Sequence, residues 1–159
     1  MAKKDVFNGA KAGLRIYDVF VQAVAEEIGM ERTLALINKV MEKGGTNTGN
    51  AMKKQAGIKK FDAKTALPLW KITPDNLGLS VKIVEESPER VFMKCTKCSV
   101  YDAAHELGMD NKTIESLCQV GGIKFTDAIV KQLNPNLTYR VVKFRSSPDD
   151  FCEEEIVLE

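Results

Sequence analysis

The chain has 159 residues, of which 44% are hydrophobic and 28% are charged, and its formal net charge is +1. This length fits one domain with a substantial core, and the balanced charge gives no global attraction to nucleic acid or to an anionic membrane. No run approaches the roughly 18 apolar residues of a membrane span, and the N-terminus lacks the apolar stretch of a secretory signal. We therefore expect a cytoplasmic protein with no membrane or nucleic-acid partner, folded as one domain over residues 1–159.

The first half of the chain predicts helices. Residues 5–28 and 31–43 carry apolar side chains three or four positions apart, which is the spacing of one helix face. Gly29 is predicted to end the first helix, because glycine readily adopts the left-handed conformation after a helix end. Gly44 and Gly45 are predicted to end the second helix for the same reason. Two shorter helices should follow, one reaching about residue 56 and one that begins near Asp62 and is cut by Pro68.

The second half contains alternating patterns that predict strands. The expected strands cover residues 79–84, 90–95, 137–144 and 151–158, and helices over residues 99–107 and 111–132 lie between the two pairs. Two isolated hairpins would be marginal, so we expect them to join in one four-stranded antiparallel sheet with helices packed on one face. The predicted fold class is α+β, with a helical N-terminal half.

Four cysteines mark the candidate site. Cys95 and Cys98 form a C-x-x-C pair, whereas Cys118 and Cys152 stand alone on different elements. In a reducing compartment such thiols indicate metal binding, catalysis or burial rather than disulfides. Four thiolates can in principle close a tetrahedral zinc site, although the second pair lacks the usual close spacing. Zinc bound by these four cysteines is therefore kept as an alternative, and haem or an iron–sulfur cluster is ranked below zinc.

Cys98 is the first candidate for catalysis. It is predicted at a helix start, where the helix dipole stabilises a thiolate. Asp102 and His105 follow on the same helix face. His105 is the only histidine, but seven residues along a helix span about 10 Å, too far for it to be the base of Cys98. It is expected to meet another thiol or a ligand, or to lie on the surface.

The remaining candidates would form a ligand-binding wall. Cys118 lies on an apolar helix stripe, which also fits simple packing. Gly121 and Gly122 follow one turn later, and each costs a helix about 1 kcal/mol relative to alanine. They predict a break or a backbone that a ligand approaches closely. Cys152 and Glu154 share one face of the last strand, where they would form a half-site unless Glu154 is solvated at the strand edge.

Four segments of the second half carry a resemblance to a known family. They are IVEESPERVFMKCTKC, SVYDAAHELG, IESLCQ and NPNLTYRVVKFRSSPDDFCEEEIV. Together they resemble the 2-amino-thiazoline-4-carboxylate hydrolase-like family. The resemblance implies that Cys98, Cys118 and Cys152 correspond to the family's cysteines and that Cys95 is an addition. Ser99 stands where the family commonly has proline.

Two functional hypotheses follow from the resemblance and from the placement of the thiols. The first is a hydrolase acting on a small cyclic or amide-type C–N substrate, with Cys98 as nucleophile and Asp102, His105 or Glu154 transferring protons. The second is a small-molecule, metal or cofactor-binding sensor domain without catalysis, because the architecture also looks like ligand-binding domains related to vinyl reductases. The long first helix either packs on the core or forms a homodimer interface.

Overall fold

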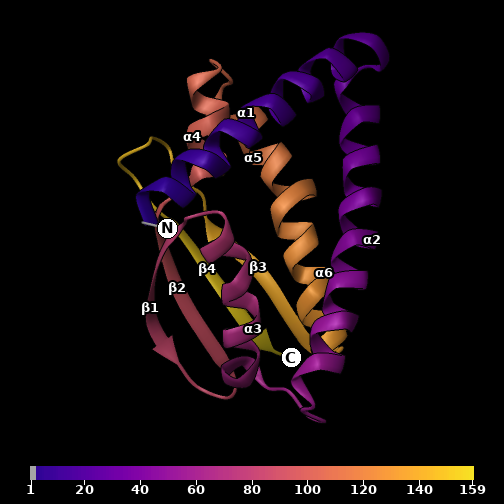
Figure 1. Cartoon of the computed structure of the whole chain (residues 1–159), viewed down its shortest axis with the longest axis vertical. Helices are drawn as coiled ribbons and strands as arrows, with labels where there is room; N and C mark the ends of the chain where they lie inside the picture. The colour runs from indigo at the N-terminus through magenta and orange to yellow at the C-terminus, as the bar shows by residue number, and fades with distance from the viewer. Residues whose placement is uncertain (1–2) are drawn as a thin grey trace.

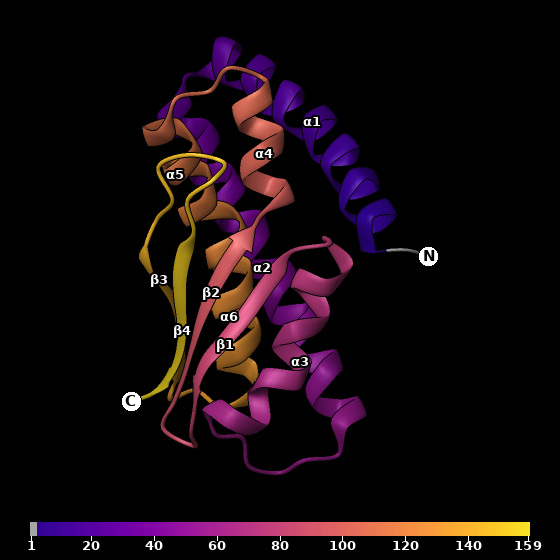
Figure 2. The ribbon, with the colours of Figure 1, turned by 90° about the vertical axis from the view of Figure 1, so that its left-hand side faces the viewer.

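An open four-stranded antiparallel sheet with its helices on one face forms the frame of the molecule (Figures 1 and 2). The computed structural model describes residues 3–159. In chain order the elements are α1 (Lys3–Ile28), α2 (Met30–Ala56), α3 (Ala63–Asn76), β1 (Ser80–Glu86), β2 (Arg90–Lys97), α4 (Ser99–Glu106), α5 (Asn111–Cys118), η1 (Gln119–Ile123), α6 (Lys124–Leu133), β3 (Leu137–Lys143) and β4 (Cys152–Leu158). The predicted α+β class, with a helical first half and two hairpins in one sheet, is confirmed.

The two hairpins join through their inner strands, because the sheet order is β1-β2-β4-β3. In the β2–β4 register, Cys95 lies opposite Cys152 and Met93 lies opposite Glu154. Successive side chains alternate between the two faces of a sheet, so these four residues share the face that the helices cover. The register thus brings two of the four thiols together at one end of the sheet.

The main core lies between this face and helices α3 and α6. It consists of Phe61, Ala63, Ala66, Leu67, Trp70, Val91, Met93, Val130, Leu133, Leu137, Tyr139 and Ile156. The rings of Trp70 and Tyr139 are tilted against each other with their centroids 6.1 Å apart. Because each large side chain that is fully buried contributes roughly 1.5–3 kcal/mol, this layer supplies most of the stability of the fold.

The double glycine at residues 44–45 does not end α2, contrary to the prediction, and the separate short helix predicted after it is part of α2. The reason is the crossing of α2 and α6. A Cβ atom on Gly45 would lie 2.2 Å from the carbonyl oxygen of Phe125, and one on Gly49 would lie 2.7 Å from that of Ile129. These glycines therefore let two helix backbones approach closely. They serve packing rather than termination.

Helix α3 begins where the sequence predicts it and extends further than predicted. Asp62 is its N-cap and forms a capping box with Thr65. The predicted interruption at Pro68 is wrong, because the helix continues through it to Asn76. Proline leaves the carbonyl four residues earlier without its helix partner. Here that carbonyl belongs to Lys64, which is exposed, so water can satisfy it.

Residues 111–133 form one helical run that contains a π turn. The turn is η1, and it includes Gly121 and Gly122, where the sequence predicts a break. The hydroxyl of Thr126 donates to the carbonyl of Gly122 at 2.7 Å. On the two sides of the π turn, α5 packs against α4, whereas α6 packs against α2 and the sheet.

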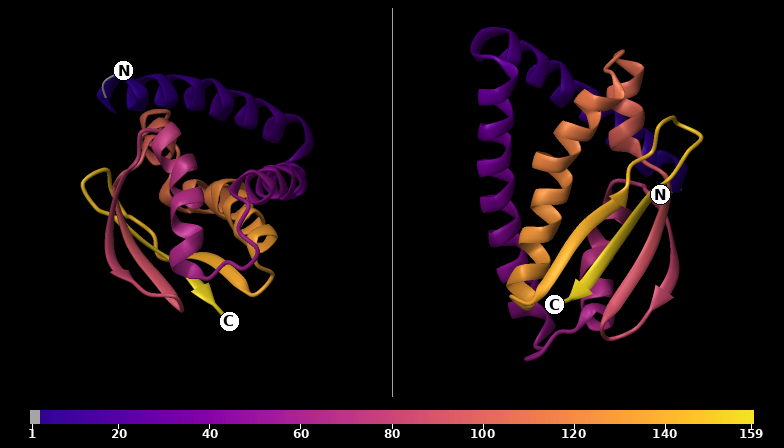
Figure 3. Two further views of the ribbon diagram at one scale, coloured as in Figure 1. Left: turned by 60° about the horizontal axis from the view of Figure 1, so that its bottom comes forward. Right: turned by 180° about the vertical axis from the view of Figure 1, so that it is seen from behind.

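Helix α1 packs against α4 and α2 and covers the end of the molecule where α4 begins (Figure 3). An ion pair of 2.6 Å joins Lys11 to Glu106. The outer side of α1 leaves Ile16 75% exposed and Phe20 65% exposed. Despite these apolar side chains, none of the helices within residues 3–159 has an apolar stretch long enough to cross a bilayer.

Candidate functional site

The four cysteines come together near the point where β2 passes into α4. Cys95 lies near the end of β2 and is 1% exposed, whereas Cys98, the N-cap of α4, is half-buried. Cys152 begins β4 opposite Cys95, and Cys118 ends α5 and packs with Cys98 against a small apolar cluster. The charges of Cys98 and Cys152 both act on the pKa of Cys118. Elements that lie far apart in the sequence thus deliver all four thiols to one region.

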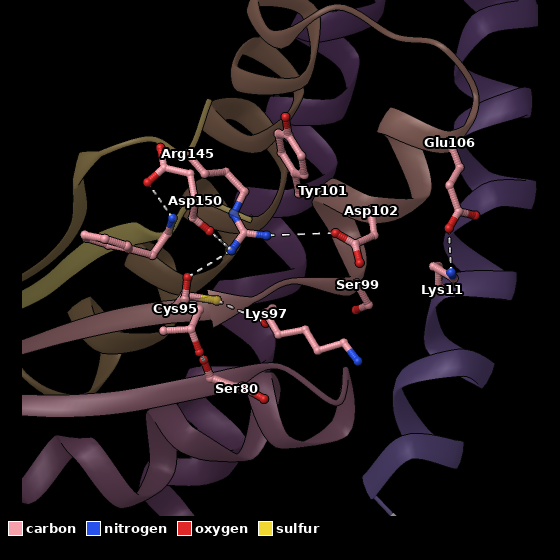
Figure 4. A network of polar contacts seen from close by, with 12 residues as sticks. Lys11, Ser80, Cys95, Lys97, Ser99, Tyr101, Asp102, Glu106, Arg145 and Asp150 are labelled. Carbon is pink, nitrogen blue, oxygen red and sulfur yellow. Dashed lines mark hydrogen bonds and ion pairs between the residues drawn. The ribbon is translucent and has the colours of Figure 1, made fainter. Parts of the chain in front are cut away.

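Cys98 is the thiol that ionises most readily. The neighbouring Cys95 thiol, which itself donates to the Lys97 carbonyl at 3.4 Å (Figure 4), lowers the pKa of Cys98; burial opposes this, while the Tyr101 backbone and the positive charge of Arg145 add to the lowering. The pKa of Cys95 is raised by the same pairing and by burial. Burial also raises the pKa values of the other two thiols, Cys118 and Cys152. The position of Cys98 at a helix start therefore coincides with thiolate character.

Glu154 is buried on the inner face of β4 rather than solvated at the strand edge. Its side chain is next to Tyr139, whose hydroxyl donates to Glu154 Oε2 at 3.0 Å. Burial raises the pKa of Glu154 to about 7, although Tyr139 and Arg145 act in the opposite direction. A carboxyl group with this pKa exchanges its proton near neutral pH, which is the property of a general acid or base.

Arg145 is a site residue that the sequence did not reveal. Its side chain is only 1% exposed, and Nη2 donates to the carbonyls of Cys95 at 3.2 Å and Asp150 at 2.7 Å (Figure 4). Its Cζ lies 5.2 Å from the centre of the Tyr101 ring, and its Nη1 lies 3.9 Å from Asp102 Oδ1. Arg145 falls between a predicted strand and a Ser-Ser-Pro-Asp turn, where charged side chains are normally solvated, so local patterns gave no signal.

The structure separates the other catalytic and glycine candidates. His105 is exposed, and its ring stacks on that of Tyr101 with centroids 5.6 Å apart. It is not brought into the buried group of thiols. Gly121 is buried, yet a Cβ atom there would meet nothing within 4 Å, so open space lies beside it. Gly122 is exposed, and only the first glycine of the pair faces the interior.

The side chains brought together here are called the end cluster below. They are Cys95, Cys98, Asp102, Cys118, Arg145, Cys152 and Glu154. Within residues 3–159, no three His, Cys, Asp or Glu side chains are arranged to hold a metal ion. The zinc site expected as an alternative thus has no preformed ligand set among the four thiols.

Two similarities to known proteins bear on this site. The fold resembles the phenol-responsive sensory domain of the transcription activator PoxR, solved with phenol, with a TM-score of 0.66 and 10% identity over 91% of this chain and 74% of that one. At this identity the likeness shows the shared fold alone. No curated protein sequence matches the chain. The sequence matches the L-2-amino-thiazoline-4-carboxylic acid hydrolase family over residues 10–152, which confirms the resemblance noted in the second half. The chain belongs to this family.

Proposed function

We propose that the protein hydrolyses a C–N bond of a small cyclic or amide-type molecule at the end cluster, with Cys98 as the nucleophile. Family membership supports the reaction class. The observation that carries the assignment to Cys98 is its position as the N-cap of α4 beside the other thiols. Its lowered pKa, in contrast to the raised pKa values of the other three thiols, agrees with that position. The thiolate is the reactive form of cysteine.

The proposed reaction has two steps. The Cys98 thiolate attacks the carbon of the C–N bond and forms a C–S bond, and the leaving nitrogen takes a proton as the C–N bond breaks. Water then adds to the carbon, the C–S bond breaks and the thiol is released. Glu154, with its pKa of about 7, and Asp102 are the proposed proton carriers. His105 is a weaker choice because it is exposed.

The test uses L-2-amino-thiazoline-4-carboxylate, the compound in the family's description, as the trial substrate. Loss of this compound is followed by chromatography with purified protein. The Cys98→Ala variant should lose about 1,000-fold or more in kcat. Cys118→Ala is the matched control, because that thiol is also half-buried but has a raised pKa. Undiminished turnover by Cys98→Ala would remove Cys98 from the mechanism.

A sensor domain without catalysis is the second candidate. The likeness to the phenol-responsive PoxR domain favours it, because the same frame holds a small molecule in that protein. Under this alternative, open space beside Gly121 would belong to the ligand cavity. Micromolar binding of a small molecule with no turnover by the wild-type protein would support the sensor and exclude the hydrolase.

A homodimer remains our proposal for the assembly. The outer faces of α1 and α2 expose Ile16, Phe20, Leu36 and Val40, each by more than half. A shallow hollow of about 320 Å³ lies beside Ile16, between α1 and Leu107. Apolar surface of this kind marks interaction sites. Light scattering at micromolar concentration should give the mass of two chains, and Phe20→Glu should halve it; a wild-type monomer would contradict the proposal.

A further inference from the structure

Strand β2 contains one extra residue just before it passes into α4. In the β1–β2 register, Cys95 lies opposite Val81, and Lys97 lies opposite Ser80. Two steps along β2 therefore correspond to one step along β1, and Thr96 is the extra residue. Such a β-bulge interrupts the alternation of side chains between the two faces of a sheet, and Thr96 and Lys97 are accordingly both exposed. Bulges commonly redirect a side chain next to a functional site.

The bulge places Cys95 and Cys98 on the same side of the chain. In a regular strand, residues three positions apart point to opposite faces, and their Cα atoms lie about 10 Å apart. A disulfide bridges only roughly 4.4–6.8 Å between Cα atoms. The extra residue shifts the alternation by one position and bends the strand. Both cysteines consequently turn inward, so that Cys95 is buried and Cys98 is half-buried.

The Cys95 thiol points along its own strand toward Cys98. It donates to the Lys97 carbonyl at 3.4 Å (Figure 4), and the carbon of that carbonyl is bonded to the backbone nitrogen of Cys98. Cys152 lies opposite Cys95 on β4, but Cys98 has the larger effect on the pKa of Cys95. Cys98 is therefore the thiol that the Cys95 sulfur reaches first.

The backbone around the two thiols is held in place from both sides. Nη2 of Arg145 donates to the Cys95 carbonyl at 3.2 Å. The hydroxyl of Ser99, the residue after Cys98, donates to the Leu77 carbonyl at 2.7 Å and fixes the start of α4. A bond between the two sulfur atoms would then need mainly rotation of the two side chains, rather than movement of the strand or of the helix.

The two thiols differ in access and in ionisation. Cys95 is only 1% exposed, whereas Cys98 is half-buried, so a small oxidant reaches Cys98 first. The pKa of Cys98 is lowered and that of Cys95 is raised, and the thiolate is the form that reacts with peroxide. An accessible thiolate with a second thiol next to it is the arrangement of redox-sensitive cysteine pairs.

The geometry points to a reversible disulfide between Cys95 and Cys98 that forms on reaction with hydrogen peroxide. The Cys98 thiolate attacks one peroxide oxygen, the O–O bond breaks, and a sulfenic acid and a hydroxide ion form. The Cys95 sulfur then attacks the Cys98 sulfur, the S–O bond breaks, and water leaves with the Cys95 proton. The hydroxide ion takes up the proton that Cys98 had released. Two thiols thus lose two electrons, and one peroxide becomes two waters.

This disulfide goes beyond the proposed function, because it adds a means of control to the same thiol. Once the Cys98 sulfur is bonded to Cys95, it cannot attack a substrate, so the proposed hydrolysis should stop until a dithiol reduces the bond. In reducing compartments disulfides are usually transient and redox-sensing. A reversible bond is therefore compatible with the four free thiols of the reduced protein.

Peptide mapping tests the disulfide without relying on turnover. The fully reduced whole chain is treated with a small molar excess of hydrogen peroxide, the remaining thiols are alkylated, and the protein is digested with trypsin without reduction. Trypsin cleaves after Lys97, so a bond from Cys95 to Cys98 joins two peptides that mass spectrometry identifies. Cys118 and Cys152 should be alkylated, and dithiothreitol should restore all four thiols.

Two variants separate the pair from the other thiols. Cys95→Ser should lower the yield of any disulfide at Cys98 about tenfold or more and let Cys98 proceed to a sulfinic acid, which dithiothreitol does not reverse. Cys152→Ser is the matched control, because Cys152 lies opposite Cys95 but has no part in the bond. It should give the Cys95–Cys98 bond within about twofold of the wild-type yield. If Cys95→Ser does not fold by circular dichroism, the wild-type peptide map still decides.

The inference would be overturned by a wild-type bond from Cys98 to Cys118 or Cys152, or by a wild-type sulfinic acid without a disulfide. Four unchanged thiols after peroxide, or equal loss of the bond in Cys152→Ser, would overturn it as well. Turnover is judged separately. A Cys95–Cys98 bond in a protein that never turns over, or that keeps its turnover when oxidised, would retain the pair and reject Cys98 as the nucleophile. Turnover that depends on Cys98, without any disulfide, would retain the hydrolase and reject the pair.

Discussion

The main core and the end cluster are built on the same strands but have opposite character. Along the inner face of β2, Val91 and Met93 are fully buried in the main core, and the next residue on that face is Cys95. Along β4, Ile156 belongs to the main core, whereas Glu154 and Cys152 belong to the end cluster. One sheet thus changes within a few residues from apolar packing to ionisable groups.

Along the length of the sheet, the apolar residues that stabilise the fold are therefore separate from the ionisable residues of the end cluster. Side chains of the main core fill space between the sheet and α3 and α6, whereas the end cluster contains buried charged atoms that have no hydrogen-bond partner. Functional sites commonly keep groups that are unfavourable for folding. Substitutions in the packed region should therefore lower the free energy of unfolding, whereas removing the charge of a buried carboxyl group such as Glu154 should leave it unchanged or raise it.

The largest effect is expected at the α2–α6 crossing beside the main core. Gly45→Ala would place a Cβ 2.2 Å from the Phe125 carbonyl oxygen, so it should cost about 3 kcal/mol through displacement of backbone. Gly44→Ala is the matched control, because its Cβ would lie 3.5 Å from the Phe125 ring and helix propensity favours alanine by up to about 1 kcal/mol. Urea unfolding measures both, and equal stabilities for the two variants would contradict the close-approach role.

Replacing Asp18 is expected to raise the free energy of unfolding rather than lower it. The charge of Asp18 also raises the pKa of Cys118. Burial raises the pKa of Asp18 to about 6. The folded state therefore disfavours the carboxylate, and the stability associated with the protonated form is present below about pH 4 and lost as the pH rises through 6. Asp18→Asn should gain up to about 2 kcal/mol at pH 7.5 and little at pH 4. Urea unfolding at both pH values tests this, and a pH-independent difference would argue against it.

The smallest expected effect is a difference in reactivity among half-buried thiols. At pH 7, iodoacetamide should label Cys98 about tenfold faster than Cys118 or Cys152, because only the pKa of Cys98 is lowered. Peptide mass spectrometry after partial labelling gives the three rates from one sample. Preferential labelling of Cys118 would show that the access of the reagent, rather than the ionisation of the thiol, controls the labelling rates in the end cluster.

The spacing of apolar residues predicted the helices and strands well, because that spacing reflects which face of each element is buried. The spacing of apolar residues in 5–28 and the alternation in 137–144 correspond to α1 and β3. Gly45 was misinterpreted because its role depends on α6, which lies about 80 residues further along the sequence. A glycine that ends a helix and one that permits a helix crossing look the same in a single sequence.

The sequence pointed to the cysteines of the end cluster and to Asp102 and Glu154 as candidates, but it did not reveal Arg145. Cys98, Cys118 and Cys152 stood out because thiols are rare and chemically distinctive. Arg145 had no such signal, since one of the carbonyls that accept from its buried side chain belongs to Cys95, which only tertiary folding brings to it. The roles proposed for Cys118, Cys152 and the glycines remain predictions.

The π turn at residues 119–123 adds one residue to an otherwise continuous helix and so rotates the faces of α5 relative to those of α6. One residue beyond regular winding corresponds to a rotation of about 100°. Loss of a single codon, such as that for Gly122, would restore regular winding and turn the segment before it by that angle relative to α6. Cys118 would then swing away from Cys98 while Ile129 and Leu133 stayed in place. A deletion of this kind would remove Cys118 from the end cluster and leave the main core packed as it is.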